Sequence, residues 1–472
     1  MTPEPEGLLS GARRGLTIGL VLAVTLVAFE ALAVATILPD AQRDLGGLAL
    51  YGWTFSAFLL MSLIGIAWSG QQCDRHGPLR PFLGGLALFA AGLTVAGTAP
   101  DMAVLVLGRA IQGLGAGAIP AVAYVCIGRG FDESQRARLF AILSTAWVVP
   151  SLVGPALAGA VSDMASWRLV FLGLLPPLLL VAVITARPLR ALGAPAQTPA
   201  TDSRLLLAGV LAAAAGTLLG GLSLGSDAPV AAVALIAVGF GVGVPALRRL
   251  LPPGTLRARG KVPAAIAGMG ILNAAFFGAE AYVPFMLTHV RHTSTLFAGL
   301  SLTASALSWT TGAWIQERLG RTIDRARIVR AGFALLFLGI SGTSLVLFSS
   351  VPVQFCGVAW ALAGLGIGMA YPCFSLAVLG GAESGGEGAA SAALKLNEVL
   401  GAALGIGIGG TIIAAAPNAE RGAIAVTFAI AATLALVGFA MAHRIAAAPV
   451  TIHAQPATPH PQTSTPEPTT TG

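Results

Sequence analysis

The feature that most constrains this chain is a succession of apolar runs separated by short polar segments or by segments that contain Pro and Gly. A helix needs about 20 apolar residues to cross the hydrocarbon core of a bilayer, and each run is about that long or longer. Numbered in chain order as spans 1 to 14, the runs cover approximately residues 16–38, 52–70, 81–99, 102–127, 139–162, 168–186, 205–225, 229–247, 263–287, 295–315, 328–349, 353–379, 389–416 and 422–442. The sequence therefore predicts an all-α integral membrane protein.

Charge is scarce in this chain and is concentrated in the loops. Charged residues make up 10% of the 472 residues, whereas soluble globular chains carry roughly 25%. If the N-terminus lies inside, 21 of the 27 Lys and Arg residues fall on the inner side, as the positive-inside rule requires. The outer loops then hold mainly acids, which are Asp40, Asp44, Asp101, Asp163, Asp227 and Glu420. The net charge of +7 therefore indicates topology, with both termini cytoplasmic in a cell membrane, and does not indicate a nucleic-acid partner.

The spans group into two sets of six on either side of an inserted pair. Charge parity alone does not distinguish twelve spans from fourteen, but residues 205–247 are long enough for two crossings, with a turn at Ser226-Asp-Ala-Pro229. The predicted segments are a cytoplasmic N-terminus (1–15), an N-terminal six-helix half (16–186), a linker (187–203), a two-helix hairpin (204–250), a second linker (251–262), a C-terminal six-helix half (263–445) and a disordered, Pro- and Thr-rich cytoplasmic tail (446–472).

An internal repeat supports this division. Asp74-Arg-His-Gly77 after span 2 recurs as Glu317-Arg-Leu-Gly320 after span 10, and Gly113-Leu-Gly-Ala-Gly117 in span 4 recurs as Gly364-Leu-Gly-Ile-Gly368 in span 12. On nearly the same offset, Glu30 in span 1 corresponds to Glu280 in span 9. Arg109 in span 4 corresponds to Trp360 and has no charged counterpart. Two halves of common origin are indicated.

Arg109 is the isolated charge of span 4. An arginine at the centre of a membrane helix costs roughly 2.5 to 3.5 kcal/mol on insertion scales, and such residues normally face a partner inside the bundle. Helical spacing places Arg109 on one face with Gly113 and Gly117, a Gly-x-x-x-Gly strip that lets another helix approach closely. A structural ion pair that clamps two helices and a charge at a transport site are both open, and Glu30 is the expected neighbour.

Several of these residues resemble the major facilitator superfamily and, within it, the fourteen-helix drug:proton antiporter branch. Span 1 ends Glu30-Ala-Leu-Ala-Val-Ala-Thr-Ile-Leu-Pro39, similar to that branch's acid nine positions before a proline, with Glu where Asp is usual. Arg109, Gln112 and Gly113 match the fourth-helix signature. The resemblance implies a major facilitator fold with two extra central helices, and it connects Arg109 with proton coupling.

Two further motifs resemble gating elements of the same family. The loop Gly70-Gln-Gln-Cys-Asp74-Arg75-His-Gly77-Pro-Leu-Arg80 is similar to the superfamily's inner-loop signature, and Pro150-Ser-Leu-Val-Gly154-Pro155-Ala-Leu-Ala-Gly159 is similar to the antiporters' Gly-Pro signature, with Pro150 and Ala158 replacing two glycines. The resemblance implies that Asp74 and Arg75 latch cytoplasmic helix ends. The expected gating residues are Gly70, Asp74, Arg75, Gly77, Arg80, Gln112, Gly113, Gly154, Pro155, Gly159, Glu317, Arg318 and Gly320.

Intramembrane charges are the candidates for energy coupling, because ionisable residues inside a membrane often mark proton pathways. Glu30, Arg109 and Glu280 are predicted to share one depth and to couple transport to protons. In a competing interpretation, one acid binds the proton and the other is a counterion for cationic substrates. Lys395 and Glu398, three residues apart in span 13, are expected to pair on one helix face, either structurally or in coupling.

Aromatic and amide side chains around Glu280 suggest a pocket for large amphiphiles. The predicted substrate-binding residues are Asn273, Phe276, Phe277, Tyr282, Asn397 and Glu398, although aromatics in membrane helices also pack on lipid or on neighbouring helices.

These observations favour a secondary transporter over an enzyme. The expected function is proton-coupled efflux of hydrophobic or amphiphilic compounds such as drugs, by alternating access of two halves around a central cavity. Alternatives are a dedicated exporter or flippase of a single lipid, glycoconjugate or metabolite, and a transport-inactive receptor or scaffold. No Gly-x-x-x-x-Gly-Lys loop is present, so the expected energy source is the proton motive force, with no cofactor. No metal site is expected, and the protein is expected to be a monomer whose partners are membrane lipid, protons and its substrate.

Overall fold

The structure is a computed structural model that describes residues 11–130, 139, 142, 146, 148–192, 203–225, 228–381, 387–416 and 419–445. The described part of the chain is helical and contains no strand. The predicted tail, residues 1–10 of the N-terminal segment, most of the first linker, part of the Ser226–Pro229 turn and most of residues 139–147 at the start of span 5 lie outside the described residues.

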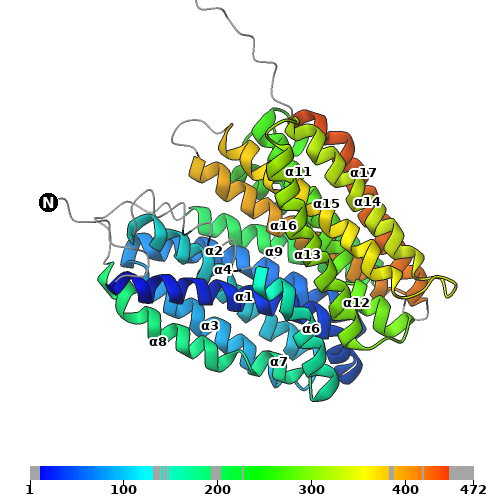
Figure 1. Ribbon diagram of the computed structural model, residues 1–472, viewed down its shortest axis with the longest axis horizontal. Coiled ribbons are helices and arrows are strands. Elements are labelled where there is room, and N and C mark those ends of the chain that lie inside the picture. The colour runs from blue at the N-terminus through cyan, green and yellow to red at the C-terminus, as the bar shows by residue number, and fades with distance from the viewer. Residues whose placement is uncertain are drawn as a thin grey trace, which may run out of the picture.

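The helices of the first group, here called the N-terminal half, lie together at the lower left of Figure 1. They are α1 (Gly11–Leu45), η1 (Leu48–Leu50), α2 (Tyr51–His76), α3 (Leu79–Gly97), α4 (Met102–Gly130), α6 (Val148–Met164), α7 (Arg168–Leu172) and α8 (Leu175–Ala191). Within this half α4 packs on α2 and α3, and α1 packs on α6 and α8.

The helices of the second group, here called the C-terminal half, lie at the upper right. They are η2 (Thr255–Arg257), α11 (Lys261–Glu280), α12 (Val283–Phe285), η3 (Met286–Val290, a π-helix), α13 (Thr295–Leu319), α14 (Arg325–Leu345), α15 (Phe355–Leu379), α16 (Glu387–Ala414), α17 (Glu420–Met441) and η4 (Ala442–Ile445). The pairing of the N-terminal half is repeated, because α15 packs on α13 and α14, and α11 packs on α16 and α17.

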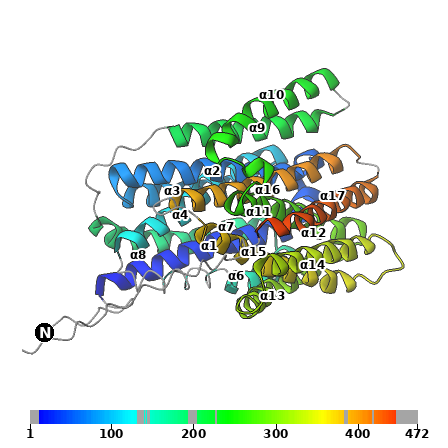
Figure 2. The ribbon, with the colours of Figure 1, turned by 90° about the horizontal axis from the view of Figure 1, so that it is seen from above.

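A two-helix hairpin follows the N-terminal half. It consists of α9 (Ser203–Leu224) and α10 (Pro229–Leu250), which pack on each other. Figure 2 shows α10 outermost and α9 between it and the rest of the molecule, where α9 contacts α2 and α16. The hairpin therefore covers a side where the two halves meet.

Twelve of the described helical segments are long and apolar enough to cross a membrane. They correspond to all predicted spans except 5 and 10. Span 5 is represented by α6, of which 17 residues are described, and span 10 by α13, whose Ser and Thr side chains lower its mean hydropathy. Counting these two, fourteen helices follow the predicted order and confirm the predicted fold class.

Two of the confirmed spans contain a break in the helix. Span 6 is divided into α7 and α8 at Gly173, just before Pro176 and Pro177. Span 9 is divided after Glu280, where the chain turns and continues as α12 and the π-helix η3. Proline has no backbone N–H to donate, and Pro284 lies in the first turn of α12, directly after the turn at Ala281 and Tyr282, so the helical ladder of α11 does not continue into α12. Runs of apolar residues do not reveal such breaks.

The two halves touch at one end and diverge at the other (Figure 1). Contacts between them involve α6 with α13, α2 with α16, and α1 with α12 and α13. The hydrogen bonds between the halves lie near the ends of helices opposite to the chain's N-terminus, for example from the Tyr51 hydroxyl to the Ala281 carbonyl (3.2 Å) and from the Ser56 hydroxyl to the Ala403 carbonyl (2.9 Å). We call this the sealed end.

Candidate functional site

Glycines on α4 create the space in which Arg109 is held. A Cβ atom added to Gly113 would lie 2.2 Å from the Phe58 carbonyl oxygen, and one added to Gly117 would lie 2.2 Å from the Ser62 carbonyl oxygen. Both carbonyls belong to α2, so α2 and α4 are in backbone contact. The predicted close approach of another helix along this Gly-x-x-x-Gly strip is confirmed, and it brings the α2 backbone within reach of Arg109.

Arg109 forms a buried ion pair with Glu30 of α1, as predicted from sequence. The Arg109 Nη1 group donates to Glu30 Oε1, and the two side chains are 2% and 1% exposed. The Arg109 Nε group also donates to the Thr54 carbonyl oxygen (3.1 Å), and its Cζ lies 4.1 Å from the centre of the Phe58 ring. The guanidinium therefore has three different kinds of partner, on α1 and α2.

Gln112 connects the two charged side chains. Its Oε1 accepts from Arg109 Nη1 (3.1 Å) and its Nε2 donates to Glu30 Oε1 (3.2 Å). Glu30 Oε2 is buried and has no hydrogen-bond partner among the described residues. One oxygen of the Glu30 carboxylate is thus bonded within the network, and the other is left unsatisfied by the described residues.

Glu280 ends α11 and is 9% exposed. Within the described part of the chain it makes no hydrogen bond or ion pair, and so it is not joined to Glu30 or Arg109. Because ionisable groups in membrane spans are rare and generally functional, this position is a candidate for proton binding.

The predicted substrate residues fall into two environments. Phe276 is buried, stacked on Trp360 (centroids 5.2 Å apart) and edge-on to Phe277 (5.2 Å) and Trp309 (5.4 Å). Phe277 is only partly buried. Asn273 is buried, and its side chain donates to the Met269 carbonyl oxygen (2.9 Å). Phe276, Phe277, Trp309 and Trp360 thus form one aromatic group in the C-terminal half.

Tyr282 lies instead in the sealed end. It is fully buried, and its hydroxyl donates to the Ile406 carbonyl oxygen of α16 (2.5 Å), while its ring lies 5.7 Å from that of Tyr51. The Tyr282 hydroxyl is also 2.9 Å from the position of a Cβ on Gly52. In this arrangement Tyr282 packs the closed contact between α2, α11 and α16.

A second polar cluster lies on α15 and α16. Lys395 Nζ contacts Glu398 Oε1 at 2.6 Å, which confirms the predicted pair, and the Tyr371 hydroxyl donates to Glu398 Oε2 at 2.8 Å. The Lys395 side chain is 54% exposed. Asn397 donates to the Ile266 carbonyl oxygen (2.7 Å) and joins α16 to α11. The sequence does not predict a role for Tyr371, because its contact with Glu398 depends on the packing of α15 on α16.

The expected gating residues are all described. Asp74, Arg75 and Arg80 are exposed where α2 ends and α3 begins. Gly77, with φ of 77°, ends α2 in a backbone conformation that favours glycine. In the corresponding loop of the C-terminal half, Glu317 pairs with Arg321 at 3.0 Å rather than with a distant helix.

The Gly-Pro motif of span 5 lies against the other half. A Cβ on Gly299 of α13 would be 2.3 Å from the Pro155 carbonyl oxygen, and a Cβ on Gly159 would be 2.8 Å from Leu296 Cα. Gly154 faces the Phe29 ring of α1, with 3.4 Å from its Cβ position to Phe29 Cδ2. The motif thus permits backbone contact between α6 and α13.

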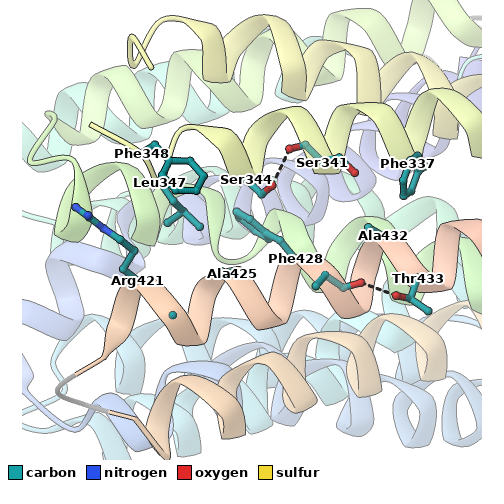
Figure 3. A pocket seen from close by; sticks show the side chains of 12 residues that line it. Phe337, Ser341, Ser344, Leu347, Phe348, Arg421, Ala425, Phe428, Ala432 and Thr433 are labelled. Atoms are coloured by element: carbon teal, nitrogen blue, oxygen red, sulfur yellow. Dashed lines mark hydrogen bonds between the residues drawn. The ribbon is translucent and has the colours of Figure 1, made fainter. Parts of the chain in front are cut away.

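Two grooves on the described structure lie away from these residues. One of about 660 Å³ runs between α14 and α17, from Phe337 to Arg421, as Figure 3 shows. The other, of about 670 Å³, is lined by α2, α3, α4 and α9, with Trp68 and Leu206 on its wall. Neither includes Glu30, Arg109 or Glu280, and we assign the candidate site to the buried charges rather than to these peripheral grooves.

A sequence profile of the Major Facilitator Superfamily matches residues 20–406. The chain belongs to this superfamily. Among curated relatives, this facilitator is 27% identical over 449 residues to a probable multidrug-efflux transporter of Mycobacterium tuberculosis (strain H37Rv), which covers 91% of the chain and 95% of the relative. It is 26% identical over 438 residues to the multidrug transporter protein MdtP of Bacillus subtilis (strain 168), covering 89% and 78%.

Solved structures support the same fold. The crystal structure of a mutant of the peptide transporter POT in complex with alafosfalin superposes with a TM-score of 0.67 at 16% identity, covering 91% of this facilitator and 94% of that chain. The crystal structure of a POT family transporter in complex with 5-aminolevulinic acid gives 0.65 at 14% identity, with 92% and 96% covered. At these identities the likeness concerns the fold alone.

Proposed function

We propose that this protein exports hydrophobic or amphiphilic compounds, such as drugs, across the cell membrane in exchange for protons. The observation that carries the proposal is the buried Glu30–Arg109–Gln112 network, because a packing role alone does not call for a buried, exchangeable carboxylate. The names of the two bacterial relatives support drug efflux. The partners are then membrane lipid, protons and the exported compound, the protein acts as a monomer, and the proton motive force drives it without a cofactor.

Alternating access follows from the arrangement of the halves. With both termini cytoplasmic, the sealed end faces outward and the diverging ends face the cytoplasm, so this is an inward-facing arrangement. Relative motion of two rigid halves would open the sealed end and close the other. The Lys395–Glu398 cluster and the Phe276–Phe277 aromatic group of the C-terminal half would then contact a compound that enters from the cytoplasm.

The Glu30–Arg109 pair is suited to a switch because protonation does not leave the cation without partners. Removing one member of a buried ion pair costs about 3 to 5 kcal/mol when the other is left uncompensated. If Glu30 takes a proton, Arg109 retains the Thr54 carbonyl and Gln112 Oε1 as acceptors. Glu280 has no such cation and supplies a second, independent proton site in this scheme.

The test is flux in proteoliposomes under an imposed pH gradient, with a panel of neutral, cationic and lipid-like compounds. We expect several chemically unrelated apolar compounds to be carried. Their transport should be faster when the pH gradient drives protons across the membrane in the opposite direction to the compound. Transport of one lipid with refusal of all drugs would overturn the assignment, and so would transport that is indifferent to the gradient.

A further inference from the structure

The N-terminus of α13 is capped by an acid from the other half of the molecule. Asp163, near the end of α6, accepts from the backbone N–H of Thr295 (3.3 Å, to Oδ1) and from that of Leu296 (2.9 Å, to Oδ2). The first N–H groups of a helix have no partner within the helix, and a negative charge near them is favourable. The helix's own cap, Ser294, takes only the N–H of Phe297 (3.2 Å). Asp163 therefore completes a helix end that belongs to the C-terminal half.

A second acid of the N-terminal half reaches the same turn. Asp40 Oδ2 accepts from the Thr295 hydroxyl (2.7 Å) and from the Ser162 hydroxyl (2.5 Å), while Oδ1 contacts Arg43 at 2.5 Å. Thr295 is 1% exposed, so this cluster is closed to solvent at its centre. Asp40 and Asp163 thus both bond to Thr295 of α13.

The backbones of α6 and α13 are in direct contact where Asp163 forms its hydrogen bonds. A Cβ on Gly159 would lie 2.8 Å from both Leu296 Cα and the Thr295 carbonyl oxygen. When α6 and α13 separate, the capping bonds of Asp163 break with them, because a hydrogen bond of 2.9 Å is lost within about 1 Å of additional separation. Separation of α6 from α13 at the sealed end therefore requires loss of this cap.

We propose that Asp163 is a positioning residue of the transport cycle: its carboxylate latches the two halves together by capping α13, and this cap favours the arrangement in which the sealed end is closed. The inference rests on the alternating access described under the proposed function. It concerns the balance between two arrangements of the halves and is independent of which compound is carried.

The test measures that balance in the full-length protein in lipid nanodiscs, without substrate or pH gradient. Spin labels are placed on cysteines at the exposed positions Thr98 and Ser350, at the sealed-end sides of the two halves, in a background without the four native cysteines. Double electron–electron resonance then reports the separation of the halves. Asp163→Ala is expected to increase the long-distance, open population roughly 2- to 30-fold, the range of effects typical of losing a helix cap.

The matched control is Asp101→Ala. Asp101 also caps a helix on this side, accepting from the Val104 N–H at 2.9 Å, but both residues belong to the N-terminal half. This substitution is expected to leave the distance distribution unchanged. Asp163→Asn is expected to give an intermediate shift, because an amide oxygen still accepts an N–H but carries no charge.

A second variant keeps Asp163 and removes donors instead. Thr295→Pro deletes the N–H bonded to Asp163 and the hydroxyl bonded to Asp40, and proline is tolerated in the first turn of a helix. Ser294, with ψ of 156°, already has the extended conformation required before proline. An unchanged distribution in both Asp163→Ala and Thr295→Pro, or an equal shift in Asp101→Ala, would overturn the proposal. If the wild-type protein carried no drug in proteoliposomes, the proposed function would fail. The distance measurements do not depend on transport, so they would still test the role of Asp163.

Discussion

Gly113→Ala tests how the packing of α2 on α4 supports the buried charges. The new Cβ would lie 2.2 Å from the Phe58 carbonyl oxygen, where ordinary contact begins at 3.4 Å, so the two helices must separate by 1.2 Å or distort. Phe58 covers the Arg109 guanidinium, and the neighbouring carbonyl of Thr54 accepts its Nε–H. The substitution therefore acts on the stability of the bundle and on the position of Arg109 at once.

The size of the effect follows from the type of defect. Overpacking in a well-packed interior typically costs about 1 to 3 kcal/mol. For a unit the size of the N-terminal half, each kcal/mol corresponds to roughly 2 to 4 °C, so we expect the unfolding midpoint to fall by roughly 2 to 12 °C. Efflux per folded molecule is also expected to fall, because Arg109 is displaced relative to Glu30.

The assay is thermal unfolding of the purified protein in detergent, together with efflux from proteoliposomes normalised to folded protein. Gly241→Ala is the control, since no atom lies within 4 Å of its Cβ position, and it should raise stability slightly through helix propensity. A Gly113→Ala protein with the stability and efflux of the wild type would refute the inferred contact between α2 and α4.

Three further substitutions probe other contacts. Asn397→Ala removes the bond to the Ile266 carbonyl between α16 and α11 and should lower stability by about 0.6 to 2 kcal/mol in thermal unfolding, whereas an unchanged midpoint would argue against that bond. Arg291→Lys should lower stability by about 1 to 3 kcal/mol in the same assay, because a lysine ammonium cannot reproduce the hydrogen bonds of the guanidinium to three carbonyl oxygens, those of Val346, Phe348 and Val351. Full retention of stability would contradict this. Lys395→Met leaves Glu398 without its cation and should raise efflux of a cationic compound relative to a matched neutral one; an unaltered ratio would place the pair outside the substrate path.

Sequence reasoning predicted the elements and the contacts that follow from local rules. The apolar runs located the helices because length and hydropathy suffice for membrane spans, and Lys395 with Glu398 follows from helical spacing. The Glu30–Arg109 pair was predicted because a buried arginine needs an anionic partner and few acids lie at the right depth.

Contacts between distant segments could not be predicted in the same way. The bonds of Asp40 and Asp163 to Thr295 join residues more than a hundred positions apart, and in sequence both acids are indistinguishable from ordinary acids of outer loops. Tyr282 was grouped with Glu280 because the two are neighbours in the chain, but the break after Glu280 directs its side chain into the sealed end. Tyr371 joined the Lys395 pair only through the packing of α15 on α16.

If Glu30 and Glu280 exchange protons during export, as we propose, movement of the substrate out of a vesicle must drive protons inward. Proteoliposomes are loaded with a transported compound, diluted to create an outward gradient, and the internal pH is followed with a trapped dye. We expect protons to move inward as the compound leaves the wild-type vesicles. In Glu30→Gln and Glu280→Gln we expect this proton movement to be lost while exchange of labelled for unlabelled compound continues. Proton movement equal to that of the wild type in both variants, for neutral and cationic compounds alike, would show that neither Glu30 nor Glu280 is a coupling site.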